Sequence, residues 1–146
     1  MKAKIRRANQ NIKFPKYGTD EAAAFDFEAS EEITIPAQKI GLVKTGLFIQ
    51  CPENYFLAIF SRSSTAGKKG LSQPHGVGVL DRDYAGPNDE VLIMVYNFTD
   101  SPVTVKAGER IAQGIFLPTQ RVEWEESETL RENSRGGFGS TGGYHP

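Results

Sequence analysis

Two acidic residues and a tyrosine follow a short apolar stretch within residues 76–86. Residues 77–80 predict a strand, and Asp81, Asp83 and Tyr84 stand at its end. A carboxylate held at the end of a strand can accept a proton from a water that attacks a bound substrate. Glycines at both ends would let a ligand approach the backbone closely. The simpler interpretation is an ordinary hairpin with solvated acids, and for this stretch alone it is favoured.

Residues 60–70 combine one arginine with several hydroxyl groups directly after an apolar run. Arg62 offers a fork of donors to phosphate oxygens, and Ser63 and Ser64 would open a short helix at 63–69, with Ser63 as its N-cap. This composition predicts an anion-binding cradle. A capped surface turn with solvated cations is about as good an interpretation.

Further candidate residues lie near the C-terminus. Residues 108–113 predict a turn that enters a strand, and in a regular strand Arg110 and Gln113 would point to opposite faces. Phe138 stands between glycine pairs, with Arg135 before it and hydroxyl residues after it, so it could stack on a flat ligand. Polar residues at a strand start and a disordered tail are the commoner interpretations. His75 adjoins the first segment without Ser-His-Asp or metal-ligand spacing.

Short strand signals separated by turns must position these residues. They recur about every ten residues, as in an all-β sandwich or barrel. One short helix, at 63–69, is the most that the pattern allows. We predict a β-barrel domain over residues 1–126 and a flexible, glycine-rich tail over residues 127–146. Strands are expected at 4–6, 12–14, 24–28, 33–35, 41–50 (with a break), 55–60, 77–80, 91–98, 103–105, 110–117 and 122–125. The runs at 55–60 and 91–98 predict strands buried on both faces.

Composition limits the classes of function. The chain has 146 residues and a formal net charge of -1, so no general positive field would attract nucleic acid or an anionic membrane. Cys51 is the single cysteine, which excludes an internal disulfide, fits a reducing compartment and favours a packing role. No signal peptide or membrane-spanning stretch is expected. The predicted location is cytoplasmic, with neither nucleic acid nor membrane as a partner.

Five segments, in this order, resemble the motifs of the trimeric dUTPases (deoxyuridine triphosphate nucleotidohydrolases). The resemblance covers almost the whole chain. Each motif is weak alone, and the ordered set with fitting spacing is specific. The segments are Ala22-Ala23-Ala24-Phe25-Asp26, Arg62-Ser63-Ser64 with the downstream Lys68 and Gly70, Gly78-Val79-Leu80-Asp81-Arg82-Asp83-Tyr84, Gly108-Glu109-Arg110-Ile111-Ala112-Gln113 and Gly136-Gly137-Phe138-Gly139-Ser140-Thr141-Gly142.

The resemblance implies a jelly-roll-like distorted β-barrel that forms a homotrimer with active sites at subunit interfaces. It also implies that each tail closes over a neighbouring site. The implied reaction is hydrolysis of dUTP to dUMP and pyrophosphate by in-line water attack on the α-phosphate. This activity would limit uracil in DNA and supply dUMP for thymidylate synthesis. Mg²⁺ is the implied cofactor, held by substrate phosphates and water without a direct protein ligand.

Residue roles follow by position in the motifs. The resemblance implies that Asp81 is the general base, that Tyr84 packs on the deoxyribose, and that Asp26 supports the metal–phosphate region. Backbone from His75 to Leu80, including Gly78, would read the uracil edge. Phe138 would stack on uracil. Phosphate contacts are implied for Arg62, Ser63, Ser64, Gln113, Arg135, Gly139, Ser140 and Thr141.

Some positions depart from the family pattern. Ser64 replaces the usual glycine of the second motif. Where the family has Tyr-Arg-Gly-Glu at the end of the third motif, this chain has Tyr84-Ala85-Gly86-Pro87, and residues 87–89 enlarge a turn. The family's tail arginine usually lies where Asn133 stands. His75 stands where several relatives carry an asparagine.

Two other functions share part of this pattern. The first is a dCTP deaminase or a bifunctional relative, which shares the fold and an Arg-Ser-Ser motif. It is disfavoured because Met94 replaces its proton-shuttling glutamate and Gly67 replaces a second arginine. The second is a non-catalytic nucleotide-binding regulator of the same fold, which would not need to retain the base Asp81.

Overall fold

The computed structural model describes residues 1–136, which form twelve strands and one helix. The strands are β1 (Lys4–Arg7), β2 (Lys16–Tyr17), β3 (Phe25–Glu28), β4 (Ile33–Ile35), β5 (Ile40–Lys44), β6 (Leu47–Gln50), β7 (Tyr55–Ser61), β8 (Leu71–Ser72), β9 (Gly78–Leu80), β10 (Leu92–Asn97), β11 (Val103–Val105) and β12 (Arg110–Pro118). The helix α1 spans Ser63–Lys69. The all-β prediction with one short helix is confirmed.

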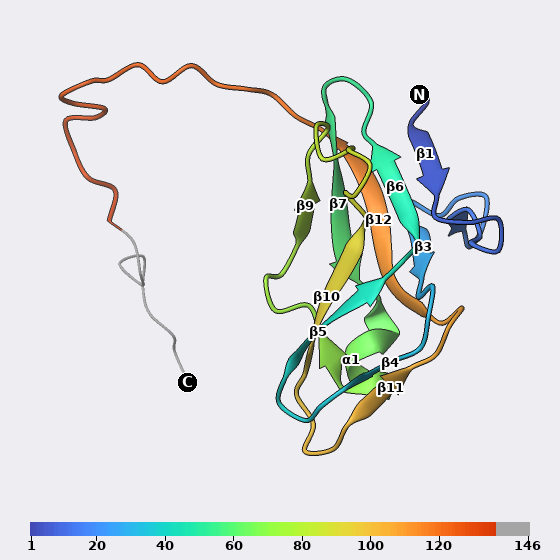
Figure 1. Cartoon of the computed structure of the whole chain (residues 1–146). Coiled ribbons are helices and arrows are strands. Elements are labelled where there is room, and N and C mark those ends of the chain that lie inside the picture. Colours follow the sequence, from blue (N-terminus) through green and yellow to red (C-terminus); the bar gives the residue numbers. More distant parts are fainter. Residues whose placement is uncertain (137–146) are drawn as a thin grey trace.

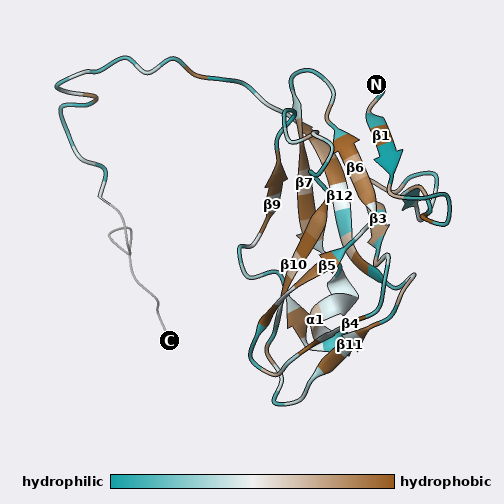
Figure 2. Ribbon diagram, in the orientation of Figure 1, coloured by the Kyte–Doolittle hydropathy of each residue, from teal (hydrophilic) through white to brown (hydrophobic). Residues whose placement is uncertain are grey.

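The main layer is a five-stranded sheet in the order β2-β3-β12-β7-β9. A three-stranded sheet, β5-β10-β8, crosses it, and the pairs β1-β6 and β11-β4 complete the barrel (Figure 1). Buried apolar side chains from these sheets form one core, including Phe27, Ile35, Leu57 and Ile93. Hydrophobic colouring follows β6, β7, β9 and β10, whereas most loops are hydrophilic (Figure 2). The sheets therefore enclose a single core.

Alternation explains how β3 is oriented. Phe25 and Phe27 are buried, while Asp26 and Glu28 on the other face are half-buried. In the middle of the sheet, β7 lies between β12 and β9 and buries three consecutive residues, 57–59. The prediction of a strand buried on both faces is confirmed for this part of β7. Together, β3, β7 and β12 form the rigid support for the polar residues discussed below.

The strand β10 differs from its prediction. Ile93 and Val95 are buried, but Leu92 on the opposite face is 39% exposed. Strand β5 pairs with β10 and carries Ile40 and Leu42, which are 57% and 47% exposed. One face of the β5-β10-β8 sheet packs on the core, and the other face remains open to solvent in the single chain. A continuous apolar run therefore did not mean burial on both faces here.

Two predicted strands are wrong. Residues 12–14 lie in a loop, where Arg7 Nη1 donates to the Ile12 carbonyl at 2.9 Å, and the strand in this region is β2 instead. Residues 122–125 have strand-like alternation but no partner strand within residues 1–136, and Trp124 is 93% exposed. Both short patterns failed because a strand needs a neighbour that its own sequence does not specify.

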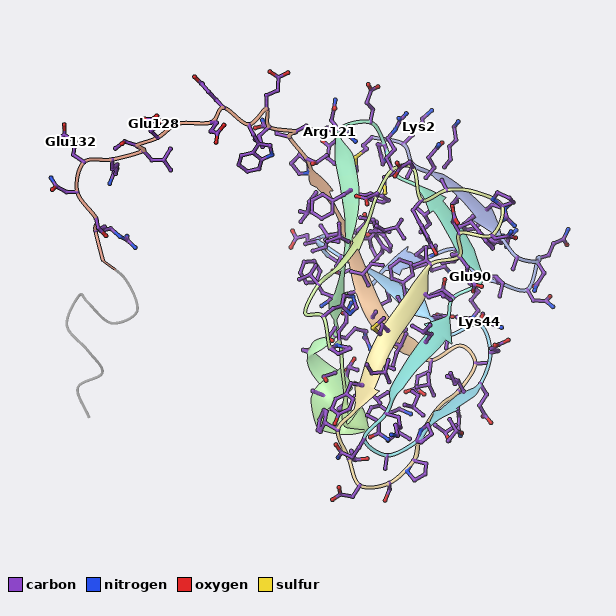
Figure 3. All side chains as sticks on the ribbon, turned by 60° about the vertical axis from the view of Figure 1, so that its left-hand side comes forward. Lys2, Lys44, Glu90, Arg121, Glu128 and Glu132 are labelled. Carbon is purple, nitrogen blue, oxygen red and sulfur yellow. The ribbon has the colours of Figure 1, made fainter. Side chains whose placement is uncertain are left out.

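After β12 the chain leaves the barrel. Residues 121–136 are all exposed and contain no helix or strand. Figures 1 and 3 show this segment running away from the barrel, with Arg121, Glu128 and Glu132 labelled along it in Figure 3. Within residues 1–136 no helix has the length and hydropathy that a membrane crossing requires.

Candidate active site

Asp26 is the centre of a charged cluster on the outer face of the main sheet. Its Oδ1 accepts from Arg62 Nε at 2.7 Å, and its Oδ2 accepts from Arg110 Nη1 at 3.2 Å. The Asp26 and Arg62 side chains are only 18% and 24% exposed, so this pair is partly shielded from water. Two guanidinium groups on one carboxylate leave a net positive charge and several unused N–H donors. This arrangement suits a bound anion.

Gln113 joins the cluster through strand register. It pairs with Asp26 of β3 on one side and with Phe60 of β7 on the other, and its Nε2 donates to the Ser61 carbonyl at 3.0 Å. The register shifts between Arg110 and Ala112, which indicates a β-bulge. Because of this extra residue, Arg110 and Gln113 share the face of Asp26. The sequence placed Arg110 and Gln113 on opposite faces only if this strand is regular, and the bulge makes β12 irregular at this point. We refer to Asp26, Arg62, Arg110 and Gln113 as the arginine cluster.

The start of α1 lies beside this cluster. Arg62 is the N-cap, with φ -81° and ψ 149°, and no side chain caps the helix. Ser63, exposed, and Ser64, half-buried, form the first turn. The prediction of Ser63 as N-cap is wrong by one residue, because the chain stays extended through Arg62 to pair it with Asp26. The predicted span of the helix, 63–69, is confirmed.

The chain passes from β8, which pairs with β10, to β9, which pairs with β7, and the connecting segment packs closely against β7. A Cβ on Gly78 would lie 3.2 Å from Ile59 Cβ, 3.3 Å from Gln73 Nε2 and 3.4 Å from His75 Nε2. Gln73 Nε2 also donates to the Ile59 carbonyl at 3.1 Å. Glycine at position 78 therefore lets β9 lie close against β7, and His75 is exposed in the turn before β9.

Asp81 follows β9 directly and is exposed. The preceding Leu80 is buried, and its carbonyl accepts from Cys51 Sγ at 3.4 Å. Burial is the main cause that raises the pKa of the Cys51 thiol, and the negative charge of Asp81 adds to it. We call residues 81–84, which follow β9, the Asp81 loop. Cys51 is thus a packing residue beneath the start of this loop, as predicted, and the raised pKa keeps its side chain in the thiol form.

Tyr84 ends the same loop. Its side chain is 40% exposed, and its hydroxyl donates to the Glu90 carbonyl at 3.2 Å. Asp83 is exposed as well. The loop therefore presents a carboxylate and an aromatic ring to solvent from the end of a strand.

The Asp81 loop and the arginine cluster lie at opposite ends of β7. Leu80 pairs with Leu57, while Arg62 follows the last residue of β7, and the two strands are antiparallel. At about 3.3 Å per residue, Asp81 and Arg62 are separated by about 20 Å along the strand. Figure 1 shows the end of β9 at the top of the barrel and α1 at the bottom. Within one chain the structure therefore does not bring the predicted base and the predicted phosphate ligands together.

The predicted tail residues fall largely outside the described part of the chain. Phe138, Gly139, Ser140 and Thr141 belong to residues 137–146, which the structure does not describe. Arg135 lies within the described residues and is exposed. Sequence reasoning placed Arg110 in a motif but gave it no role in the site, because its reach to Asp26 depends on the bulge.

Comparison with known proteins identifies the family. A family model described as dUTPase matches residues 10–142. The chain belongs to the dUTPase family. The deoxyuridine 5'-triphosphate nucleotidohydrolase of Helicobacter pylori (strain P12) is 39% identical over 144 residues, covering 97% of each chain. That of Rickettsia bellii (strain OSU 85-389) is 40% identical over 136 residues, covering 90% of this chain and 89% of that protein.

Solved dUTPase structures share the fold. The dUTPase from Streptococcus mutans is 34% identical, with a TM-score of 0.75, over 82% of this chain and 98% of that chain. A variant of the Staphylococcus bacteriophage 80alpha dUTPase with dUpNHpp is 22% identical, with a TM-score of 0.80, over 97% of this chain and 98% of that chain. The jelly-roll-like fold and the expectation of a nucleotide-hydrolysing enzyme are both confirmed by this dUTPase membership.

Membership of the dUTPase family also argues against the deaminase alternative. Met94 lies half-buried on β10 and offers no group that could transfer a proton. Nearby Asn97 is fully buried, and its Nδ2 donates to the carbonyls of Ile35, Pro36 and Ser101. Asn97 therefore holds the turns around the end of β10.

Proposed function

We propose that this dUTPase hydrolyses dUTP to dUMP and pyrophosphate at sites assembled from different subunits of a homotrimer. The observation that carries the proposal is the position of Asp81 and Tyr84 at one end of β7 and of the arginine cluster at the other end. A single triphosphate is much shorter than this separation. A second copy of the chain would bring its own arginine cluster to the Asp81 loop.

Asp81 is the proposed general base. Its exposed carboxylate would accept a proton from a water as that water attacks the α-phosphorus in line. A new bond forms between the water oxygen and the α-phosphorus, and the bond from the α-phosphorus to the bridging oxygen breaks. Pyrophosphate leaves with the bonding electrons. Besides accepting this proton, Asp81 would hold the water in position for the attack.

Arg62, Ser63, Ser64 and Gln113 are the proposed phosphate ligands. The guanidinium of Arg62 is fixed by Asp26, so it would not need to be reorganised as charge moves onto the leaving group. Ser63 and Ser64 offer hydroxyl groups beside it. Arg110 joins this set because it shares Asp26 with Arg62.

Mg²⁺ is the proposed cofactor. Among residues 1–136 no group of three or more His, Cys, Asp or Glu side chains is placed to hold a metal ion. This donor set fits an ion that binds mainly substrate phosphates and retained waters, the preference of Mg²⁺. Asp26, the carboxylate of the arginine cluster, would accept hydrogen bonds from those waters. When bound, the ion neutralises charge on the phosphates.

Residues 75–80 and the Tyr84 ring are the proposed determinants of substrate choice. Backbone groups from His75 to Leu80, including Gly78, would pair with the uracil edge. The partly exposed Tyr84 ring would pack against the deoxyribose and leave no room for a 2′-hydroxyl.

The open apolar face of the β5-β10-β8 sheet supports the homotrimer. Ile40, Leu42 and Leu92 lie on that face and are each more than a third exposed. A second copy that covered this face would remove apolar surface from water. Each Å² of apolar surface buried in this way would stabilise the assembly by roughly 25 cal/mol. Closed symmetry then generates three equivalent sites.

Residues 127–146 are the proposed lid. They would reach a neighbouring site, where Phe138 stacks on uracil, and where Arg135, Gly139, Ser140 and Thr141 contact the terminal phosphates. We further propose a cytoplasmic location, where dUMP production would supply thymidylate synthesis and keep uracil out of DNA. The near-neutral net charge of -1 supports dUTP alone, rather than nucleic acid or a membrane, as the partner.

Pyrophosphate release from four nucleotides tests the proposed function. We expect kcat/KM for dUTP to exceed that for dCTP, dTTP and UTP by at least about 10³-fold, because unpaired polar groups penalise the wrong base and the tyrosine penalises the ribose. A chelator should remove most of the turnover, and added Mg²⁺ should restore it. Faster turnover of another nucleotide, or no turnover of any, would contradict the proposal.

A further inference from the structure

The turn that follows Tyr84 is held by the N-terminal strand. Arg6 on β1 donates from Nη2 to the Pro87 carbonyl at 2.6 Å. Its guanidinium also lies 3.5 Å from the ring centroid of Phe48, its cross-strand partner on β6. A planar guanidinium stacked on a ring is pre-organised, so it loses little freedom when it makes a hydrogen bond. Arg6 is therefore a fixed donor for this turn.

The turn is also fixed from within and from the barrel. Gly86 N donates to Asp89 Oδ2 at 2.7 Å, and Glu90 Oε1 accepts from Gly46 N at 2.7 Å. Figure 3 shows Glu90 and Lys44 on the same flank of the barrel. The hydrogen bond that Lys44 donates to Glu31 is the main cause that raises the pKa of Lys44, and the charge of Glu90 adds to it. The turn is thus tied to β1 at Pro87 and to the connection between β5 and β6 at Glu90.

Tyr84 is connected to the same turn by its hydroxyl group. The hydroxyl donates to the Glu90 carbonyl at 3.2 Å, and Gly86 and Pro87 lie on the path between these two residues. A shift of residues 86–90 would therefore move the hydrogen-bond acceptor that fixes the ring. Both acceptors, the carbonyls of Pro87 and Glu90, belong to the main chain, so the position of the ring depends on the path of the turn.

We propose that Arg6 is a positioning residue that sets the place of the Tyr84 ring, and so the selectivity of the enzyme for deoxyribonucleotides over ribonucleotides. The inference rests on the proposed role of Tyr84 at the sugar. Arg6 acts through the Pro87 carbonyl and the Glu90 carbonyl and touches no substrate. Since a small displacement of a positioning group can cost a large factor in rate, loss of this one contact should be measurable.

The test is the ratio of kcat/KM for dUTP to kcat/KM for UTP. Arg6→Met keeps a long apolar side chain but removes the donors and the charge, and it should lower the ratio about tenfold. Arg7→Met is the matched control, because Arg7 donates to the carbonyls of Gln10 and Ile12 and contacts Phe14 instead. It should leave the ratio within about twofold of the wild-type value.

Further variants make the result decisive. Arg6→Lys keeps the charge without the stacked fork, so it should also lower the ratio, and it replaces Arg6→Met if that variant does not fold. Tyr84→Ala should collapse the ratio. If Tyr84→Ala collapses the dUTP-to-UTP ratio but both Arg6 variants keep the wild-type ratio, the proposed role of Arg6 is wrong and that of Tyr84 stands. A wild-type ratio in Tyr84→Ala would overturn the sugar gate itself, and with it this inference.

Discussion

Asp81→Asn is expected to lower kcat for dUTP hydrolysis by about 10³-fold, the range of a lost general base. This corresponds to about 4 kcal/mol of transition-state stabilisation. The substitution keeps the size of an exposed side chain and removes its ability to accept the proton of the attacking water. The Kd for dUTP should change by less than about fivefold, because the phosphate ligands and the proposed base-reading residues 75–80 are intact. Steady-state turnover and equilibrium binding with the same preparation measure both quantities.

Asp83→Asn is the matched control for this prediction. Asp83 is exposed in the same loop, two residues further along, and also carries one negative charge. Its substitution should leave kcat within about threefold of the wild-type value, since an exposed charge away from the reacting atoms contributes little. If both variants lose turnover equally, the loop charge as a whole matters and Asp81 has no special role. A kcat for Asp81→Asn within tenfold of wild type would remove it as the base.

Arg62→Met is the second change with a large expected effect. It removes the guanidinium that Asp26 fixes at 2.7 Å, and kcat/KM should fall by about 10²- to 10³-fold, as for one lost transition-state donor. Folding should persist because Arg110 still pairs with Asp26, and we expect a loss of about 1–2 kcal/mol in the free energy of unfolding. Activity assays and thermal unfolding of the same variant separate these two effects.

Lys68→Met serves as the control for charge alone. Lys68 is exposed on α1, a few residues from Arg62, and it also contributes one positive charge. Its loss should change kcat/KM by less than about threefold, because solvent screens an exposed cation. Equal losses in the two variants would mean that only the net charge near α1 counts, not the pairing of Arg62 with Asp26.

Local sequence signals were sufficient for most of the fold. The helix at 63–69 was predicted from its N-terminal serine, and in the structure Gly70, with φ 67°, ends it. Turn residues likewise bounded β4 and β11 correctly. The N-cap was misplaced because Arg62 is held extended by Asp26, a contact with another strand. Such a contact is not visible in the local pattern.

The parts of the site that depend on distant contacts were not predictable. The bulge that brings Arg110 beside Gln113 is a property of the pairing of β12 with β3, not of β12 alone. The open face of β10 could not be read from its apolar run, because the same run would suit a strand covered by another chain. The bond from Arg6 to the Pro87 carbonyl joins residues 81 positions apart. The motif residues were found because five local signatures, each weak alone, occur in the order and spacing of the family.

Mixing two inactive variants tests the central claim, that each site combines Asp81 of one subunit with the arginine cluster of another. Asp81→Asn and Arg62→Met are each expected to be nearly inactive, and every mixed trimer would contain one intact site. Random assembly of equal amounts makes about three quarters of the trimers mixed, so co-expressed or co-refolded chains should show about a quarter of wild-type kcat. Activity no greater than the average of the two separate variants would contradict the shared site.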